Sequence, residues 1–214
     1  MFGFGVKKDR KKTKVLAFAN QKGGVGKTTT TINLGSAMAE SGQKVLIIDL
    51  DPQGNASTGL GINKEDRDFS IYDVLSQEKN IVDIKLDTPV GNLEIVPSTL
   101  DLLGLESTLV NDSDKSYKLK KAIQSLDSSS DSYFDYILID CPPSLNLLTI
   151  NALAASDAII VPLQCEFYAL EGLGQLLETV DHVRETLNKD LLIHGVLLTM
   201  FDERNNLSLS LIHI

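Results

Sequence analysis

The fold class of this 214-residue chain is decided by one glycine-rich stretch, QKGGVGKTT at residues 21–29. The stretch follows an apolar, β-branched run that ends at Asn20, and a helical pattern begins at Thr28. A strand, a glycine loop and a helix in that order are the context that a phosphate-binding loop requires. Backbone N–H groups approach phosphate closely only where no side chain obstructs them, and glycine also adopts positive φ angles. The stretch therefore predicts a phosphate-binding loop.

Two side chains at the end of this loop carry its predicted chemistry. Lys27 would reach the β- and γ-phosphates of a nucleotide, the Thr28 hydroxyl would ligate Mg²⁺, and the following helix would add its N-terminal dipole. The usual pattern places glycine at position 21, where this chain has Gln21. The alternative is a glycine-rich turn that binds no ligand. The predicted nucleotide-binding residues of the loop are Lys22, Gly23, Gly24, Val25, Gly26, Lys27, Thr28 and Thr29.

Short runs rich in valine, isoleucine and leucine alternate with helical patterns along the chain. Runs that are apolar on both faces are typical of strands buried in a mostly parallel sheet. Their alternation with helices indicates a doubly wound α/β fold, in which ligands bind at the carboxyl ends of the strands. The predicted strands cover residues 15–19, 45–48, 93–96, 136–139, 158–161 and 193–198, and the predicted helices 28–40, 116–126, 145–154 and 170–187.

The segment KGGVGKTT at residues 22–29 resembles the deviant Walker A motif of the ParA/MinD family of P-loop ATPases. In that family the additional lysine, here Lys22, reaches the phosphates of the nucleotide in the partner subunit. The resemblance therefore implies a homodimer with ATP sandwiched at its interface, and catalytic roles for Lys22 and Lys27. A cation supplied across an interface stabilises the transferring phosphoryl group only after dimerisation.

Two aspartates follow the second predicted strand, in the segment DLDPQGN at residues 49–55. Asp49 and Asp51 are two positions apart and point the same way from an extended chain. Neighbouring carboxylates are costly unless cations or donors compensate them, so a metal–nucleotide neighbourhood is plausible. A polar turn capped by Asp49 is the better interpretation of these residues alone, and the weaker one beside the glycine loop. The segment resembles the switch of the partition branch more than that of MinD. The resemblance implies that Asp51 orients the attacking water and that Asp49 lies near the Mg²⁺ shell.

The predicted strand at residues 136–139 ends in Asp140. An apolar run that ends in aspartate is a Walker B pattern, whose carboxylate would hold Mg²⁺ through water. An aspartate that only caps the strand is the alternative. The segment DCPPS at residues 140–144 resembles the D-x-P-P-S motif of the same family, which implies a metal-binding role for Asp140.

The resemblance extends over about residues 13 to 208 and is weakest over 62–130. Residues 162–174 resemble the loop and helix that flank the dimer interface of the family. The segment TMFD at residues 199–202 resembles the strand end near the adenine, which implies that Met200 contacts the nucleotide base.

The composition, with 43% hydrophobic and 23% charged residues, is that of an ordinary globular protein and excludes collagen and disulfide scaffolds. Cys141 and Cys165 form no CxxC pair, which fits a reducing cytosol. No apolar run approaches the length of a membrane helix, and no apolar signal core follows the basic start. We therefore expect a cytoplasmic protein with no stable membrane association, and the resemblance implies a nucleoid-associated protein of bacterial or archaeal type.

The net charge of −9 is unevenly distributed. Residues 1–14 hold six cations against Asp9, which gives +5 and leaves −14 for the remaining 200 residues. An acidic body argues against constitutive electrostatic binding of DNA, although a local basic face would permit it. Residues 1–13 form a basic leader, for which a solvated terminus is favoured over contact with an anionic surface.

The last six residues, 209–214, have the sequence LSLIHI, which matches one reading frame of a transposon-end sequencing adaptor. Chains of the ParA/MinD family, which this sequence resembles, continue beyond this point with further helices and a strand. We therefore expect residues 209–214 to be an artefactual tail and residues 14–208 to be an ATPase domain without its C-terminal part. The basic surface for non-specific DNA is then expected in the missing part.

Taken with these residues, the resemblance implies a partition ATPase of the ParA/Soj type. ATP and Mg²⁺ would form the dimer, the dimer would bind DNA without sequence preference, and a ParB-like protein would stimulate hydrolysis. The alternatives are a MinD-like membrane-associated positioning ATPase, a metabolic P-loop enzyme of related fold, and a truncated chain that folds poorly and hydrolyses nothing.

Overall fold

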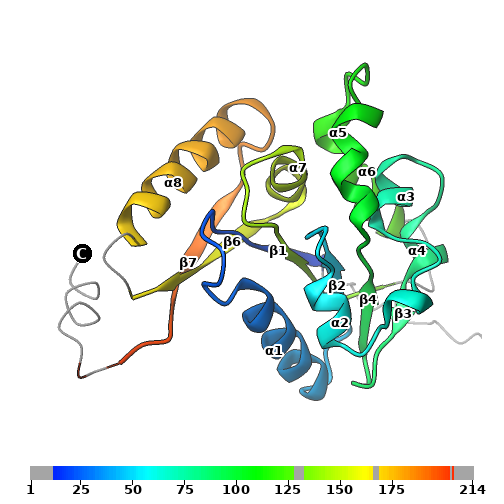
Figure 1. The fold of residues 1–214 in the computed structure, drawn as a ribbon, viewed down its shortest axis with the longest axis horizontal. Helices are drawn as coiled ribbons and strands as arrows, with labels where there is room; N and C mark the ends of the chain where they lie inside the picture. The colour runs from blue at the N-terminus through cyan, green and yellow to red at the C-terminus, as the bar shows by residue number, and fades with distance from the viewer. Residues whose placement is uncertain (1–11, 128–132, 166–168, 203, 205–214) are drawn as a thin grey trace, which may run out of the picture.

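The computed structural model describes residues 12–127, 133–165, 169–202 and 204. In these residues seven strands form one sheet in the order β3-β4-β2-β5-β1-β6-β7, with helices on both faces (Figure 1). All neighbouring strands run parallel except β3, which is antiparallel to β4. The strands are β1 (Lys14–Phe18), β2 (Val45–Asp49), β3 (Leu86–Asp87), β4 (Leu93–Val96), β5 (Tyr136–Asp140), β6 (Ala158–Gln164) and β7 (Leu192–Thr199).

In the described residues, the helices that flank the sheet comprise four of nine residues or more and four of four or five residues. The longer helices are α1 (Lys27–Glu40), α6 (Lys118–Asp127), α7 (Leu147–Ala155) and α8 (Ala169–Thr186). The short ones are α2 (Asn55–Gly59), α3 (Ile71–Leu75), α4 (Ile81–Ile84) and α5 (Leu105–Thr108), with 3₁₀ turns at Lys64–Asp66, Leu100–Gly104 and Lys115–Tyr117.

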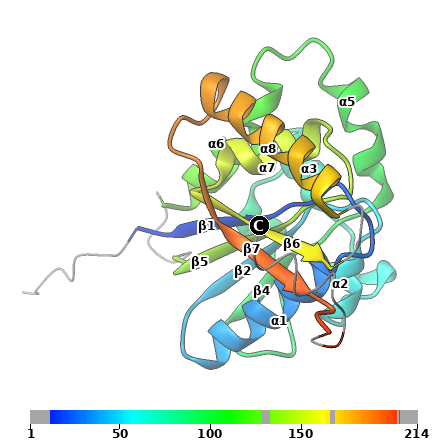
Figure 2. The same cartoon turned by 90° about the vertical axis from the view of Figure 1, so that its left-hand side faces the viewer.

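The central strands are apolar throughout because both faces of the sheet are covered. Figure 2 shows α1 on one side of the sheet and α7 and α8 on the other. Successive side chains of β2 point to opposite faces. Leu46 and Ile48 belong to the core cluster that includes residues of α3, α6 and α7, whereas Val45 and Ile47 belong to the cluster on the side of α1 and α2. All four are fully buried, which explains why their run shows no polar alternation.

This architecture confirms the predicted doubly wound α/β fold. The predicted strand at 193–198 forms as Leu192–Thr199, and that at 158–161 extends to Gln164. The predicted helix at 116–126 begins at Lys118, because a 3₁₀ turn takes up the residues before it. The short helices α2 to α5 and strand β3 have no counterpart among the predicted elements. Four or five residues span little more than one helical turn and show no repeated periodicity, and β3 has only two residues.

Some predictions fall on residues that the structure does not describe. Only residues 12 and 13 of the basic leader are described, and the tail at 209–214 lies wholly outside. Within the described part, no helix combines the length and the apolar character that crossing a bilayer demands.

The strand order brings three strand ends together at one edge of the sheet. In the register of β1 with β5, Phe18 lies opposite Asp140, and in that of β2 with β5, Asp49 lies opposite Asp140. Parallel strands end on the same side, so the loop after β1 lies beside the aspartates that end β5 and β2.

Candidate functional site

The glycine loop joins β1 to α1 in the conformation that the sequence predicts. Gly24 and Gly26 have φ angles of 75° and 87°, in the left-handed region that glycine enters without a Cβ penalty. Helix α1 begins at Lys27, and its N-cap residue Gly26 supplies no side-chain cap. The first N–H groups of α1 are therefore available to an anion bound at the helix end.

Lys27 is a buried cation at the start of α1, with 6% of its surface exposed. Its Nζ donates a hydrogen bond to the carbonyl oxygen of Lys22 at 3.0 Å. Burial lowers the pKa of the Lys27 ammonium, and the nearby charges of Asp140 and Asp51 oppose that change. The structure thus brings the loop lysine together with two of the predicted site carboxylates.

Asp140 ends β5 and is fully buried. Its Oδ1 accepts a weak hydrogen bond from Thr31 Oγ1 at 3.5 Å, and its Oδ2 has no hydrogen-bond partner among the described residues. Burial first, and then the charge of Asp49, raise the pKa of Asp140 to about 7, while a hydrogen bond from the Thr28 side chain opposes the rise. A buried, unsatisfied carboxylate oxygen beside a hydroxyl suits a hard divalent cation, so these residues fit Mg²⁺.

Asp49 lies beside Asp140 but is already engaged by protein donors. Its Oδ2 accepts hydrogen bonds from the backbone N–H of Ser57 at 2.8 Å and from Ser57 Oγ at 2.7 Å. Its Oδ1 accepts from the backbone N–H of Asp51 at 3.3 Å. Burial raises the pKa of Asp49 to about 6 in spite of these donors. Asp49 therefore fixes the start of α2, and its place near a Mg²⁺ shell stays a prediction.

Asp51 lies on the turn between β2 and α2 and is 8% exposed. Its Oδ1 accepts a hydrogen bond from the backbone N–H of Gln53 at 3.0 Å. Its carbonyl oxygen accepts from Gly54 N–H at 2.8 Å and from Ser98 Oγ at 2.6 Å. The turn is thus held at the backbone, and the carboxylate lies close enough to Lys27 to influence its pKa.

The end of β7 also contacts the glycine loop, a contact that the sequence does not predict. Thr199 Oγ1 donates to the carbonyl oxygen of Val25 at 2.8 Å. The next residue, Met200, has a φ of 51° and is 60% exposed, so its side chain is open to a ligand. The resemblance of TMFD at residues 199–202 places this strand end near the adenine, but the contact itself joins residues that are 174 positions apart and has no signal in the linear sequence.

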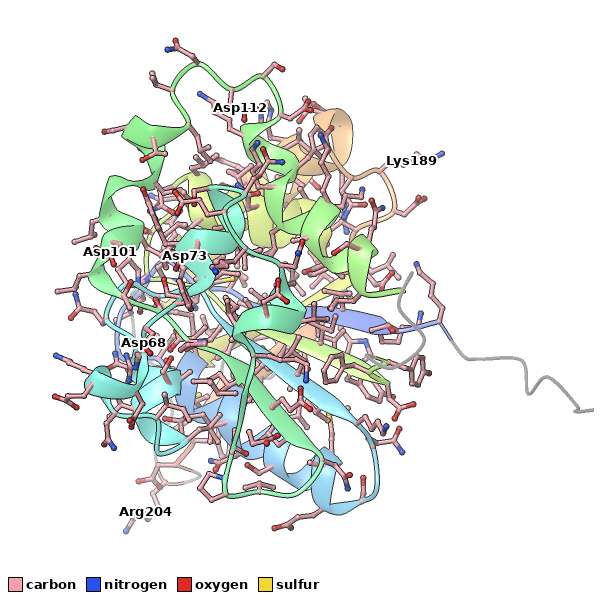
Figure 3. All side chains as sticks on the ribbon, turned by 90° about the vertical axis from the view of Figure 1, so that its right-hand side faces the viewer. Asp68, Asp73, Asp101, Asp112, Lys189 and Arg204 are labelled. Atoms are coloured by element: carbon pink, nitrogen blue, oxygen red, sulfur yellow. The ribbon has the colours of Figure 1, made fainter. Side chains whose placement is uncertain are left out.

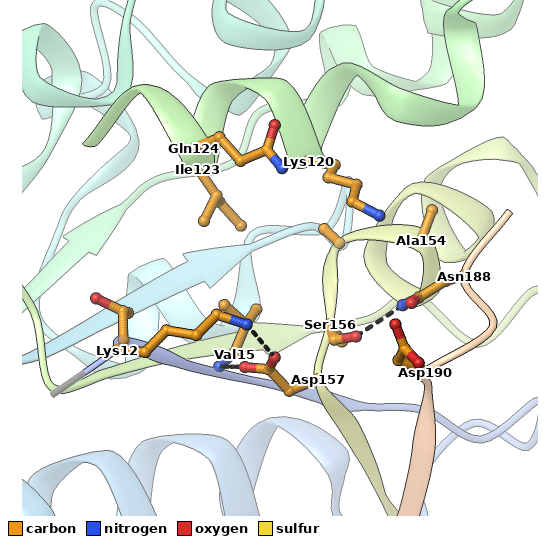
Figure 4. A pocket seen from close by; sticks show the side chains of 12 residues that line it. Lys12, Val15, Lys120, Ile123, Gln124, Ala154, Ser156, Asp157, Asn188 and Asp190 are labelled. Carbon is orange, nitrogen blue, oxygen red and sulfur yellow. Dashed lines mark hydrogen bonds and ion pairs between the residues drawn. The ribbon is translucent and has the colours of Figure 1, made fainter. Parts of the chain in front are cut away.

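A cavity at the opposite end of the sheet is lined by residues that pair with one another (Figure 4). It has a volume of about 190 Å³ and lies at the amino ends of β1 and β6. Lys12 Nζ pairs with Asp157 at 3.1 Å, and the same carboxylate accepts from Val15 N–H at 2.9 Å. Asn188 donates to the carbonyl oxygen of Ser156 at 2.8 Å. Ligands of doubly wound folds bind at the other edge, so the glycine loop remains the candidate site.

The predicted acidic character of the body is visible on the surface. Asp68, Asp73, Asp101 and Asp112 lie on one side of the molecule, on α3 and the segments around it (Figure 3). Asp112 forms an ion pair with Lys118, so the chain itself compensates part of this negative charge.

Comparisons with known proteins identify the family of the chain. The family described as an AAA domain matches residues 13–193. The sporulation initiation inhibitor protein Soj of Bacillus subtilis (strain 168) is 52% identical over 199 residues, 93% of this chain and 77% of that protein. The chromosome partitioning protein ParA of Caulobacter vibrioides (strain NA1000 / CB15N) is 54% identical over 195 residues, 91% of this chain and 72% of that protein. This chain belongs to the ParA/Soj family.

A solved structure similar to the ParA/Soj chain contains a nucleotide and magnesium. The crystal structure of cobyrinic acid a,c-diamide synthase from Mycobacterium smegmatis, with bound ADP and magnesium, superposes with a TM-score of 0.88 and 41% identity. The match covers 94% of this chain and 80% of that chain. A homologous structure thus holds a nucleotide and magnesium on the same fold, and the resemblance to partition ATPases drawn from the motifs is confirmed.

Proposed function

We propose that this chain is an ATP-dependent, dimerising switch ATPase for chromosome or plasmid partitioning. In the ATP state the dimer binds DNA without sequence preference, and a ParB-like protein stimulates hydrolysis and release. The observation that carries the proposal is the position of the glycine loop, which follows β1 directly beside the end of β5, where a buried oxygen of Asp140 has no hydrogen-bond partner among the described residues. The identity of 52% with Soj and 54% with ParA supports the partition role.

The proposed reaction is phosphoryl transfer from ATP to water, with release of ADP and phosphate. The backbone N–H groups of the loop, from Gly23 to Thr29, bind the phosphates, and Lys27 moves from the Lys22 carbonyl to neutralise the charge on them. Asp51 orients the attacking water in line with the γ-phosphate. Met200 contacts the base from the end of β7. The reaction takes place in the cytoplasm, on the nucleoid.

Mg²⁺ would be held by the Thr28 hydroxyl and, through water, by Asp140, with Asp49 behind them. When bound, the cation neutralises charge that develops on the phosphate oxygens. The unsatisfied Oδ2 of Asp140 is the observation that favours this assignment. Because burial keeps the pKa of Asp140 near 7, the carboxylate binds a cation best in its ionised form, at neutral pH and above.

Phosphate release from ATP tests the enzymatic proposal. We expect slow turnover by the purified protein, and faster turnover when DNA and the ParB-like protein encoded nearby are added. Asp51→Ala should bind ATP and keep the dimer, with turnover reduced to a residual rate. Unchanged turnover in Asp51→Ala would reject its role with water, and no stimulation by either addition would reject the partition role.

Light scattering tests the cross-subunit role of Lys22. We expect the wild-type chain to dimerise with ATP and Mg²⁺, and Lys22→Ala to stay monomeric and inactive while it still binds ATP. Lys14→Ala is the matched control, because Lys14 is exposed at the start of β1, at the other end of the strand. An ATP-dependent dimer of Lys22→Ala would contradict the proposed role.

A metabolic function is the second candidate, favoured by the likeness to the cobyrinic acid a,c-diamide synthase structure. An enzyme of that kind would form amide bonds at carboxylates of its substrate. Turnover that depends on cobyrinic acid and an ammonia donor, and not on DNA or a partner protein, would establish it in place of the partition role.

A further inference from the structure

Arg67 is a buried cation near the Asp51 turn, with 7% of its surface exposed. Its Nη1 donates to the carbonyl oxygen of Ser98 at 3.0 Å. Its Nη2 donates to Thr58 Oγ1 at 2.8 Å and to the carbonyl oxygen of Ile62 at 2.7 Å. Its Nε has no partner, and no carboxylate of the described residues forms an ion pair with it. Within the described part of the chain, neutral oxygens alone therefore hold this guanidinium.

Burying the Arg67 guanidinium among neutral groups costs free energy. Burying a charge without an opposite charge costs more than burying an apolar side chain of the same volume. The guanidinium is planar, so its N–H groups point in fixed directions and can hold several oxygen atoms in one arrangement. Arg67 thereby joins the end of β4, helix α2 and the loop after α2.

The same segments hold the turn that carries Asp51. Ser98, whose carbonyl oxygen accepts from Arg67, donates through Oγ to the carbonyl oxygen of Asp51 at 2.6 Å. Its N–H donates to Ser57 Oγ at 3.1 Å. Gly54 ends the turn with a φ of 64°, and a Cβ at this position would lie 2.2 Å from Arg67 Nη1. The guanidinium is therefore packed directly against the Asp51 turn.

We propose that Arg67 is a positioning residue for hydrolysis, which holds Asp51 in place through Ser98 and Gly54. The inference rests on the proposed role of Asp51 with the attacking water. The hydrogen bonds of Arg67 go to Ser98, Thr58 and Ile62, all outside the glycine loop, so its loss should leave ATP binding intact while it slows the reaction. A displacement of a catalytic group by about 1 Å can cost on the order of 100-fold in rate.

A double-mutant cycle with Arg67→Gln and Asp51→Ala tests the proposal, with kcat and KM for ATP measured in the presence of DNA and the ParB-like partner. We expect Arg67→Gln to lower kcat roughly 10- to 100-fold with KM changed by less than about twofold. In the Asp51→Ala background we expect Arg67→Gln to have no further effect, because two residues that act as one unit are not additive.

The outcomes separate the two proposals. Independent effects of Arg67→Gln and Asp51→Ala that multiply in the double variant would overturn the inference and leave the function of Asp51 intact. An Asp51→Ala chain with wild-type turnover would overturn the role of Asp51 and with it this inference. A rise in KM with unchanged kcat would assign Arg67 to nucleotide binding and overturn its positioning role.

A second pair of variants decides the question if Arg67→Gln does not fold. Thr58→Val keeps the side-chain volume but removes the hydroxyl, which accepts from Arg67 Nη2 and donates to the carbonyl oxygen of Gly54 at 3.0 Å. Thr58→Ser keeps the hydroxyl and therefore both hydrogen bonds. We expect kcat to fall about 10-fold or more in Thr58→Val, because a hydrogen bond to a charged donor is lost, and to recover in Thr58→Ser. Equal kcat values in the two variants would overturn the inference.

Discussion

Replacing Asp140 by asparagine should stabilise the nucleotide-free chain at neutral pH while it abolishes metal-dependent hydrolysis. Burial and the neighbouring Asp49 raise the pKa of Asp140 from 3.8 to about 7. A carboxyl group with a raised pKa in the folded state keeps its proton there while the unfolded chain loses it, so stability falls as pH rises from about 4 to about 7. At about 1.4 kcal/mol for each pH unit between the two pKa values, the loss is on the order of 4 kcal/mol.

Urea unfolding between pH 4 and pH 8, in the presence of a chelator, measures this effect. An asparagine side chain cannot ionise, so the free energy of unfolding of Asp140→Asn relative to wild type should increase by about 4 kcal/mol across that range, with most of the change below pH 7. Asp68→Asn, a change at an exposed aspartate, is the control and should show no such dependence. A difference between Asp140→Asn and wild type that is constant with pH would refute the reasoning.

The same variant separates stability from function. Mg²⁺ with nucleotide should stabilise wild type by about 2.7 kcal/mol at about 100 times its dissociation constant, since a ligand that binds only the folded state shifts unfolding by mass action. Asp140→Asn should lose most of that gain in a thermal shift measurement. Equal stabilisation of both proteins by Mg²⁺ and nucleotide would contradict the assignment of Asp140 to the metal.

Three further changes test the loop and its supports. Gly26→Ala forces a side chain into a φ of 87° and should cost about 1–2 kcal/mol of unfolding free energy, measured in urea; a smaller change would contradict the strain. Thr199→Val removes the bond to Val25 and should weaken ATP binding in calorimetry, whereas Thr199→Ser should not; equal affinities would reject the contact. Ser57→Ala removes a donor to Asp49 and should lower the free energy of unfolding by about 1–3 kcal/mol. The loss should be larger at pH 8 than at pH 4, because the donor favours the ionised carboxylate. An equal loss at both pH values, measured by urea unfolding, would contradict this reasoning.

The local parts of the fold and site could be predicted from sequence because they depend on neighbouring residues. Glycine permits the positive φ values found at Gly24 and Gly26, so the spacing of the glycines indicates where such a loop can form. The apolar run before Asp140 forms a buried strand for the same local reason. The alternation of such apolar runs with helices places the ends of parallel strands together, so the predicted and the observed sheet agree.

The supports of the site could not be predicted, because they join segments that are far apart in the chain. Arg67 lies 31 positions from the Ser98 carbonyl that it binds, and it falls in the part of the sequence where the family resemblance is weakest. An arginine next to Asp68 in a polar segment is typical of a solvated surface, and only the packing of β4 and α2 around it buries it. The engagement of Asp49 by Ser57 is equally absent from any linear pattern.

The bond between Thr199 and the glycine loop has a consequence for how the chain acquires its activity during synthesis. The two residues are separated by 174 positions, and a ribosome adds about 5–20 residues per second. The loop therefore emerges roughly ten seconds or more before the strand that contacts it. We expect a nascent chain to form β1 and α1 early and to gain full affinity for ATP only after β7 has docked, so the nucleotide would reach a chain whose sheet is already assembled.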